Sequence, residues 1–136
     1  MTFSRENWDH ARWPNFAPSE FVCRETASLA MDGPFLDKLQ ALRTKLGFPL
    51  VISSGYRSTR HSIEKAKASP GVHCTGKAAD IAVCSRDADR LIRTAIELGF
   101  TGIGIKQHGD YSKRYVHLDT VPDGNGFARP MIWTYV

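Results

Sequence analysis

The chain has 136 residues, of which 42% are hydrophobic and 24% are charged, and its formal net charge is +4. These values are typical of one globular domain with a hydrophobic core. A membrane-spanning helix is excluded, because no run approaches the roughly 18 apolar residues that such a helix needs.

The first eight residues lack the apolar core of a secretory signal peptide, so we expect synthesis in the cytoplasm without one. Any action outside the cell would then require delivery by other means. The three cysteines, Cys23, Cys74 and Cys84, cannot all pair, and we expect reduced thiols.

Residues 1–15 include Trp8 and Trp13 but show no clear periodicity. We expect them to form an extended arm whose aromatic side chains pack on a single domain made of residues 16–136.

A helix is predicted to begin near Asp32, with Asp32 or Gly33 as its cap and Pro34 in its first turn, and to end at Gly47. The apolar residues between these points recur at helical spacing, which indicates a face that packs on the core.

Residues 49–53 are predicted to form a buried strand that runs into Ser54-Gly55-Tyr56-Arg57. Gly55 permits a sharp turn that aims Arg57 into a cleft, and the alternative is that Arg57 forms a salt bridge on the surface. A short helix with Ser58 as its cap is predicted to follow over residues 58–68.

Two candidate metal ligands, His73 and Asp80, lie seven positions apart and are separated by small or polar residues. We expect His73 on a loop and Asp80 on a strand, with Ile81 pointing to the core on the opposite face. A buried carboxylate needs a cation or a metal as its partner. Without a third ligand, the simpler interpretation is an Asp–Arg ion pair beside an incidental histidine.

One further helix and then several strands are predicted in the rest of the chain. Ser85 is predicted to cap a helix that ends at Gly99. Residues 101–105 form a strand, and the polar loop 106–114 joins it to the next strand as a hairpin. Residues 131–136 form a closing strand.

The third candidate ligand is His117, which shares one face of a predicted strand with Tyr115 and Asp119. His73, Asp80 and His117 together predict a site for one zinc ion, because two histidines and one aspartate leave the fourth position open, as in catalytic zinc sites. The cysteines have no paired spacing, so a closed structural zinc site is not expected.

Three segments resemble those of a known family. His73–Asp80 matches the H-x-x-G-x-A-x-D pattern of the zinc D-alanyl-D-alanine peptidases, His117–Asp119 is similar to their second histidine segment, and Ser54–Arg57 resembles their S-G-Y-R element. The segments occur in the family's order, and the resemblance covers about residues 16–133. Segregated helices and strands predict an α+β fold. The resemblance implies the fold shared with the hedgehog signalling domain, a small and mostly antiparallel sheet with helices packed on one side.

The resemblance implies a zinc-dependent peptidase that hydrolyses D-amino-acid-containing bonds in the stem peptides of bacterial peptidoglycan. It would act as a carboxypeptidase or as an endolysin-type endopeptidase of phage or prophage character. The resemblance also implies that Arg57 holds a substrate carbonyl or carboxylate, a task that suits a guanidinium better than an amine. We expect Tyr56 and Trp133 to contact substrate, and the protein to be a monomer.

Hydrolysis also needs a base. Several relatives have an acid three residues before the second histidine, where this chain has Arg114. Asp119 is the candidate base. Its alternative role is to orient His117 as a hydrogen-bond partner. Asp110, in the preceding loop, is the other candidate base.

Two other functions remain open at this point. A catalytically inactive zinc domain that binds cell-wall peptide would explain the acid missing at Arg114. A nucleic-acid binder would suit the net charge, but it needs a basic stripe with stacking aromatic residues, and the sequence shows none.

Overall fold

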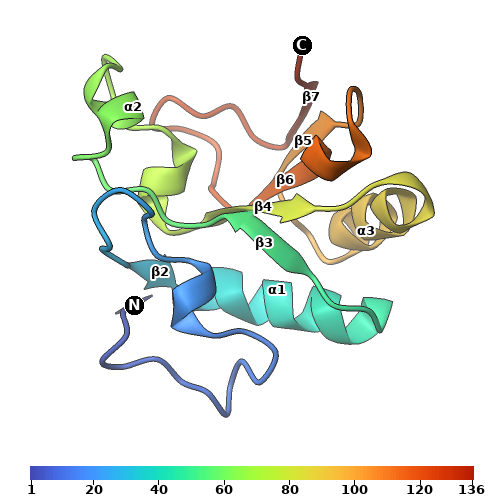
Figure 1. Cartoon of the computed structure of the whole chain (residues 1–136), viewed down its shortest axis with the longest axis horizontal. Helices are drawn as coiled ribbons and strands as arrows, with labels where there is room; N and C mark the ends of the chain where they lie inside the picture. Colours follow the sequence, from blue (N-terminus) through green and yellow to red (C-terminus); the bar gives the residue numbers. More distant parts are fainter.

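A five-stranded sheet with the strand order β3-β4-β6-β5-β7 forms the centre of the computed structural model, which describes residues 1–136 (Figure 1). Its strands are β3 (Val51–Ser54), β4 (Ala78–Ala82), β5 (Gly102–Lys106), β6 (Tyr115–Asp119) and β7 (Met131–Thr134). Neighbouring strands are antiparallel except β5 and β7, which are parallel. The predicted α+β fold with a mostly antiparallel sheet is therefore confirmed.

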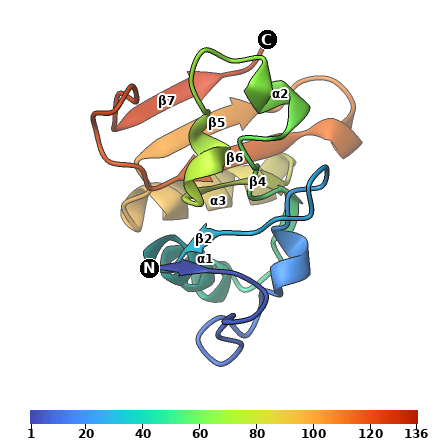
Figure 2. The same cartoon turned by 90° about the vertical axis from the view of Figure 1, so that its left-hand side faces the viewer.

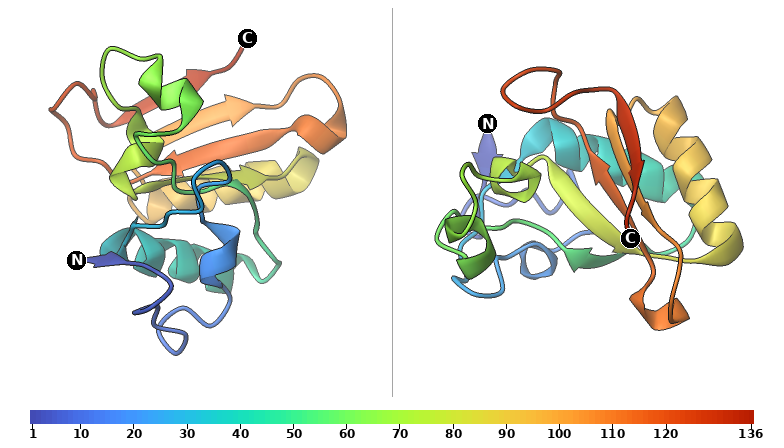
Figure 3. Two further views of the ribbon diagram at one scale, coloured as in Figure 1. Left: turned by 60° about the vertical axis from the view of Figure 1, so that its left-hand side comes forward. Right: turned by 90° about the horizontal axis from the view of Figure 1, so that it is seen from above.

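The two long helices, α1 (Gly33–Leu46) and α3 (Ser85–Glu97), pack against each other on one side of the sheet. The short helix α2 (Ser62–Lys65) and the 3₁₀ turn η2 (Val72–Thr75) lie on the other side, in front of the strands in Figure 2. Figure 3 shows the same separation from two further directions. The sheet therefore has a core face under α1 and α3 and a second face that is free to carry a site.

The predicted boundaries of α1 are confirmed. The Asp32 carboxylate accepts a hydrogen bond from the Phe35 backbone N–H at 3.0 Å, and Gly47 ends the helix in the left-handed conformation with φ of 75°. The helix buries an apolar stripe against the sheet that consists of Phe35, Leu36, Leu39, Leu42 and Leu46.

Two predicted caps are wrong. Ser58 Oγ accepts from the Arg60 N–H and closes an earlier turn, so α2 begins later, with His61 Nδ1 accepting from the Ile63 N–H at 3.1 Å. At α3 the chain is still extended at Cys84 after β4, so Cys84 occupies the cap position and Ser85 is the first helical residue.

The N-terminal segment packs against α1. Trp13 is fully buried and Trp8 nearly so, and both belong to the same core as the leucines of α1. The indole N–H of Trp13 donates to Asp37 at 2.9 Å and that of Trp8 to the Phe16 carbonyl at 3.1 Å, so neither buried donor is left unpaired. Strand β1 (Thr2–Phe3) pairs with β2 (Met31–Asp32) immediately before α1.

The remaining short elements are the 3₁₀ turns η1 (Pro18–Glu20) and η3 (Tyr111–Lys113). None of the helices combines the length and the apolar character that crossing a bilayer requires.

Gly76 is expected to be less tolerant of substitution than Gly47, although both have left-handed backbones with φ of 73° and 75°. A Cβ at Gly76 would lie 2.2 Å from the Ala30 carbonyl oxygen, whereas a Cβ at Gly47 would meet nothing within 4 Å. Gly47→Ala should therefore cost only the left-handed strain, about 1 kcal/mol of unfolding free energy. Gly76→Ala should cost more than about 2 kcal/mol, because the backbone must also shift. Urea denaturation of both variants measures the difference, and equal losses would contradict the steric argument.

Candidate metal centre

Three side chains that are distant in sequence meet on the free face of the sheet. Asp80 on β4 and His117 on β6 are direct partners in the antiparallel ladder, and His73 approaches them from η2. Asp80 Oδ1 lies 3.0 Å from His117 Nδ1 and 3.5 Å from His73 Nε2. One donor atom from each residue lies within 4.8 Å of the others, which makes the three a possible metal-binding group. The predicted loop at His73 is instead a 3₁₀ turn, and Asp80 lies on a strand as expected.

The second nitrogen of each imidazole has a fixed partner. His73 Nδ1 lies 2.9 Å from the Gly55 carbonyl oxygen, and His117 Nε2 lies 2.8 Å from Asp119 Oδ2. Because these partners accept hydrogen bonds, each imidazole in its neutral form would keep its proton on that side, which leaves the nitrogen that faces Asp80 available to a metal ion. Two nitrogen donors and one carboxylate oxygen thus converge on one point, which suits zinc.

The electrostatics of the group also favour a cation. Burial opposes charge on both partners, yet the hydrogen bonds from His117 and His73 hold the pKa of Asp80 well below its usual value. Burial would likewise lower the pKa of His117, but Asp119 and Asp80 raise it. Two carboxylates around one buried imidazole therefore demand positive charge at this place.

Asp119 lies on the side of the His117 ring away from Asp80. It is fully buried, and its two oxygens accept from Arg129 Nε at 3.0 Å and Nη2 at 2.8 Å, in addition to His117. Both oxygens are thus occupied, and Asp119 does not line the cleft above the histidines. Of the two predicted roles of Asp119, this position favours the one in which it orients His117.

Arg129 was not predicted from the sequence, because it lies in the Gly/Pro-rich segment after β6. The available signal was the buried Asp119 itself, since a buried carboxylate needs a cationic partner. The other candidate acid, Asp110, is exposed and does not line the cleft. Arg114 donates to the Gly109 carbonyl and its guanidinium lies 4.2 Å from the centre of the Tyr111 ring, so it stays within its own loop.

A cleft of about 260 Å³ opens over the three donor atoms. Its lining consists of Arg57, Lys67, Val72, His73, Asp80, Tyr115, His117, Trp133 and Tyr135. The predicted substrate residues Arg57 and Trp133 therefore lie at the metal group, and the Trp133 ring centre is 5.1 Å from that of His117. Burial raises the pKa of Tyr135 to about 12, so its phenol remains a hydrogen-bond donor at neutral pH.

Glycines on the neighbouring strand β5 make room for these side chains. A Cβ at Gly104, the ladder partner of His117, would lie 2.6 Å from Trp133 Nε1. A Cβ at Gly102 would lie 2.2 Å from a carboxylate oxygen of Asp119. The alternation of glycine and isoleucine along β5 therefore leaves one face for the site and uses the other for the core.

Arg57 is both in the cleft and in an ion pair. Its Nη1 lies 2.9 Å from Glu64 Oε2, and the Glu64 side chain is completely buried. Glu64 also accepts from Lys67 Nζ at 3.0 Å and from the Gly71 backbone N–H at 2.7 Å. Glu64 thus connects Arg57 to the segment that leads into His73. Nothing in the local pattern distinguishes it from a surface acid, and it was not predicted.

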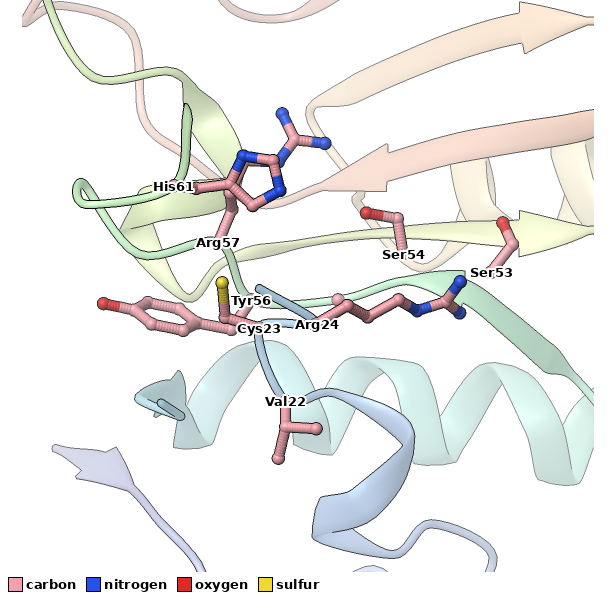
Figure 4. Close-up of a pocket in the computed structure, with 9 residues that line it drawn as sticks. Val22, Cys23, Arg24, Ser53, Ser54, Tyr56, Arg57 and His61 are labelled. Carbon is pink, nitrogen blue, oxygen red and sulfur yellow. The ribbon is translucent and has the colours of Figure 1, made fainter. Parts of the chain in front are cut away.

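Tyr56 does not line the metal cleft. Its N–H donates to the Phe21 carbonyl at 2.7 Å, and in Figure 4 its ring points away from the Arg57 guanidinium. A Cβ at Gly55 would lie 2.6 Å from the Phe21 Cα, so close approach of two backbones explains this glycine. Tyr56 lines a neighbouring hollow instead.

Comparison with protein families finds a match to the family described as Peptidase M15 over residues 14–119. This range is more than half of the chain and includes all three residues of the metal group. A search among curated proteins finds no match.

Asp119→Asn is expected to weaken zinc binding by about 10- to 100-fold although it removes no ligand, because it disturbs the hydrogen bond that orients His117. Titration of chelator-stripped protein against a chromophoric zinc indicator measures the affinity, with circular dichroism to verify the fold. Asp110→Asn is the matched control and should bind zinc as the wild type does. An unchanged affinity in Asp119→Asn would show that the contact does not support the site.

Glu64→Gln is expected to flatten the acid dependence of stability. Burial alone would raise the pKa of Glu64, but its bonds with Gly71, Arg57 and Lys67 lower it to about 2, against 4.5 for the unperturbed group. The unfolded chain therefore binds the proton more readily, so Glu64 stabilises the fold above pH 4.5 and loses this contribution as the pH falls towards 2.

Urea denaturation between about pH 7 and pH 2 measures this dependence. Glu64→Gln should be less stable than the wild type at neutral pH and should lose less stability across the acid window. Glu97→Gln is the control, because Glu97 pairs with Lys45 at the exposed surface. Parallel curves for the wild type and Glu64→Gln would contradict the assignment.

Proposed function

The chain belongs to the peptidase M15 family, the zinc D-alanyl-D-alanine peptidases, and on this premise we propose that it hydrolyses D-amino-acid-containing bonds in the stem peptides of bacterial peptidoglycan with one zinc ion. The observation that carries the proposal is the convergence of His73, Asp80 and His117 at the base of an open cleft. The net charge of +4 favours approach to an anionic wall polymer.

The ion would be held by His73 Nε2, a carboxylate oxygen of Asp80 and His117 Nδ1, the atoms that face one another. When bound, zinc supplies a Lewis acid that polarises the peptide carbonyl and lowers the pKa of the attacking water. Asp119 acts as a positioning residue, because its bond to His117 Nε2 keeps the Nδ1 lone pair directed at the ion.

Arg57 binds the substrate carbonyl or carboxylate. Its planar fork is held at the cleft by the buried Glu64, so little side-chain freedom is lost when substrate binds. Tyr135 offers a phenol O–H to negative charge that develops on the carbonyl oxygen. Trp133 presents an aromatic surface to the substrate chain beside His117.

A catalytically inactive zinc domain that binds cell-wall peptide is the second candidate. One observation favours it: Asp80 is the only carboxylate that lines the cleft, and a ligand to the metal is not free to act as the base. This alternative retains the same metal group and the same peptide-binding residues but predicts no turnover.

Digestion of purified peptidoglycan with zinc-loaded protein, followed by mass spectrometry of the muropeptides, separates the two candidates. The peptidase should release peptides whose masses identify the bond that is cut, and His117→Ala should release none. Arg57→Gln should lower kcat/KM by about 10- to 100-fold, because a charged hydrogen bond to substrate is lost. The matched control is Arg60→Gln at an exposed neighbouring position. Binding of zinc and stem peptide without any release would instead support the binding domain.

A further inference from the structure

A second polar hollow, of about 190 Å³, adjoins the metal cleft on the side of β3 (Figure 4). Arg57 lines both cavities. Ser54, in the wall of the hollow, is the ladder partner of Asp80, and the carbonyl of Gly55 in the same wall bonds His73. The hollow therefore lies next to the metal cleft, and the end of β3 separates it from the metal group.

The lining of the hollow is basic and contains no carboxylate. Arg24, Arg57 and His61 contribute to it. Arg57 is paired with Glu64 and His61 with Glu25, which leaves Arg24 without an acidic partner. The hollow thus has an excess of positive charge.

The backbone that carries the two arginines is fixed by the fold, while the Arg24 side chain itself is exposed. The backbone on either side of Arg24 forms a closed turn, in which Cys23 N–H donates to the Ser28 carbonyl at 2.8 Å and Ala27 N–H to the Cys23 carbonyl at 2.7 Å. Arg57 uses only Nη1 for Glu64, so its remaining N–H groups are free to bind a ligand. In Figure 4 the Arg24 side chain runs along β3 towards Ser53, and the Arg57 guanidinium lies at the other end of the hollow beside His61.

Two guanidinium groups and a serine hydroxyl match a carboxylate, which accepts several hydrogen bonds and carries the opposite charge. A neutral carboxamide has one acceptor oxygen and brings two N–H donors into a space already supplied with donors. The hollow should therefore discriminate between these two groups of nearly equal size.

We propose that the hollow is a subsite for a free carboxylate of the substrate, held by Arg24 with the open side of Arg57, and that it makes the protein select stem peptides with a free carboxylate over those in which that group is amidated. This inference rests on the proposed peptidoglycan substrate. An extended peptide advances about 3.3 Å per residue, so a chain that crosses the metal group beside Arg57 brings the side group of a nearby residue to Arg24.

The test uses two synthetic stem peptides that differ only in a carboxylate or a carboxamide next to the scissile bond. We measure kcat/KM from product release by zinc-loaded protein, and Kd by calorimetry if no product forms. The wild type should prefer the free carboxylate by about 10-fold. Raising the salt concentration should reduce this preference.

Arg24→Gln should reduce the preference to less than about 2-fold, whereas Arg24→Lys should retain part of it because the charge remains. Arg86→Gln, at an exposed position on α3, is the control and should keep the full preference. Thermal melting of each variant verifies that the fold is intact.

Equal kcat/KM values of the wild type for the two peptides would overturn the inference, and so would a preference that persists in Arg24→Gln. Either result would leave the peptidase proposal standing. A preference in Kd that depends on Arg24, found without any hydrolysis, would support the subsite and reject the peptidase instead.

Discussion

The imidazole of His117 is buried on one face of the sheet between two carboxylates. The rest of the site depends on neutralising the negative charge of these carboxylates. Asp80 faces one ring nitrogen and Asp119 the other, at 3.0 and 2.8 Å. Buried carboxylates without partners would destabilise the fold, so positive charge must be supplied at both ends. Arg129 supplies it at Asp119. At Asp80, His117 and His73 are the partners in the structure, and the metal ion that we propose would bind among these three residues.

Much of this architecture could be predicted because it depends on local spacing. The leucine stripe and the Asp32 and Gly47 ends defined α1, and alternation along β4 and β6 placed Asp80 and His117 on one face. The antiparallel ladder then makes these two residues direct partners. His73 could be added because the small residues between it and Asp80 allow close approach of the backbones.

What could not be predicted depends on pairing between distant segments. Glu64 and Arg129 resemble ordinary surface residues in the sequence, and only the folded chain shows that they neutralise Arg57 and Asp119. The caps at Ser58 and Ser85 failed for a related reason, since nearby residues place the helix starts elsewhere. The role of Asp119 was ambiguous because a strand pattern shows which face a side chain occupies but not which neighbour fills the space beside it.

The two ends of the segment between Arg57 and His73 lie together at the site. The Arg57 N–H donates to the His73 carbonyl at 3.1 Å, and Glu64 joins Arg57 to Gly71 from within the segment. The positions of Arg57 and His73 therefore do not depend on the length or composition of the outer part of this loop. Such a loop is a natural place for exchange between homologues or for directed evolution, provided that the replacement retains an acid able to reach both anchor points.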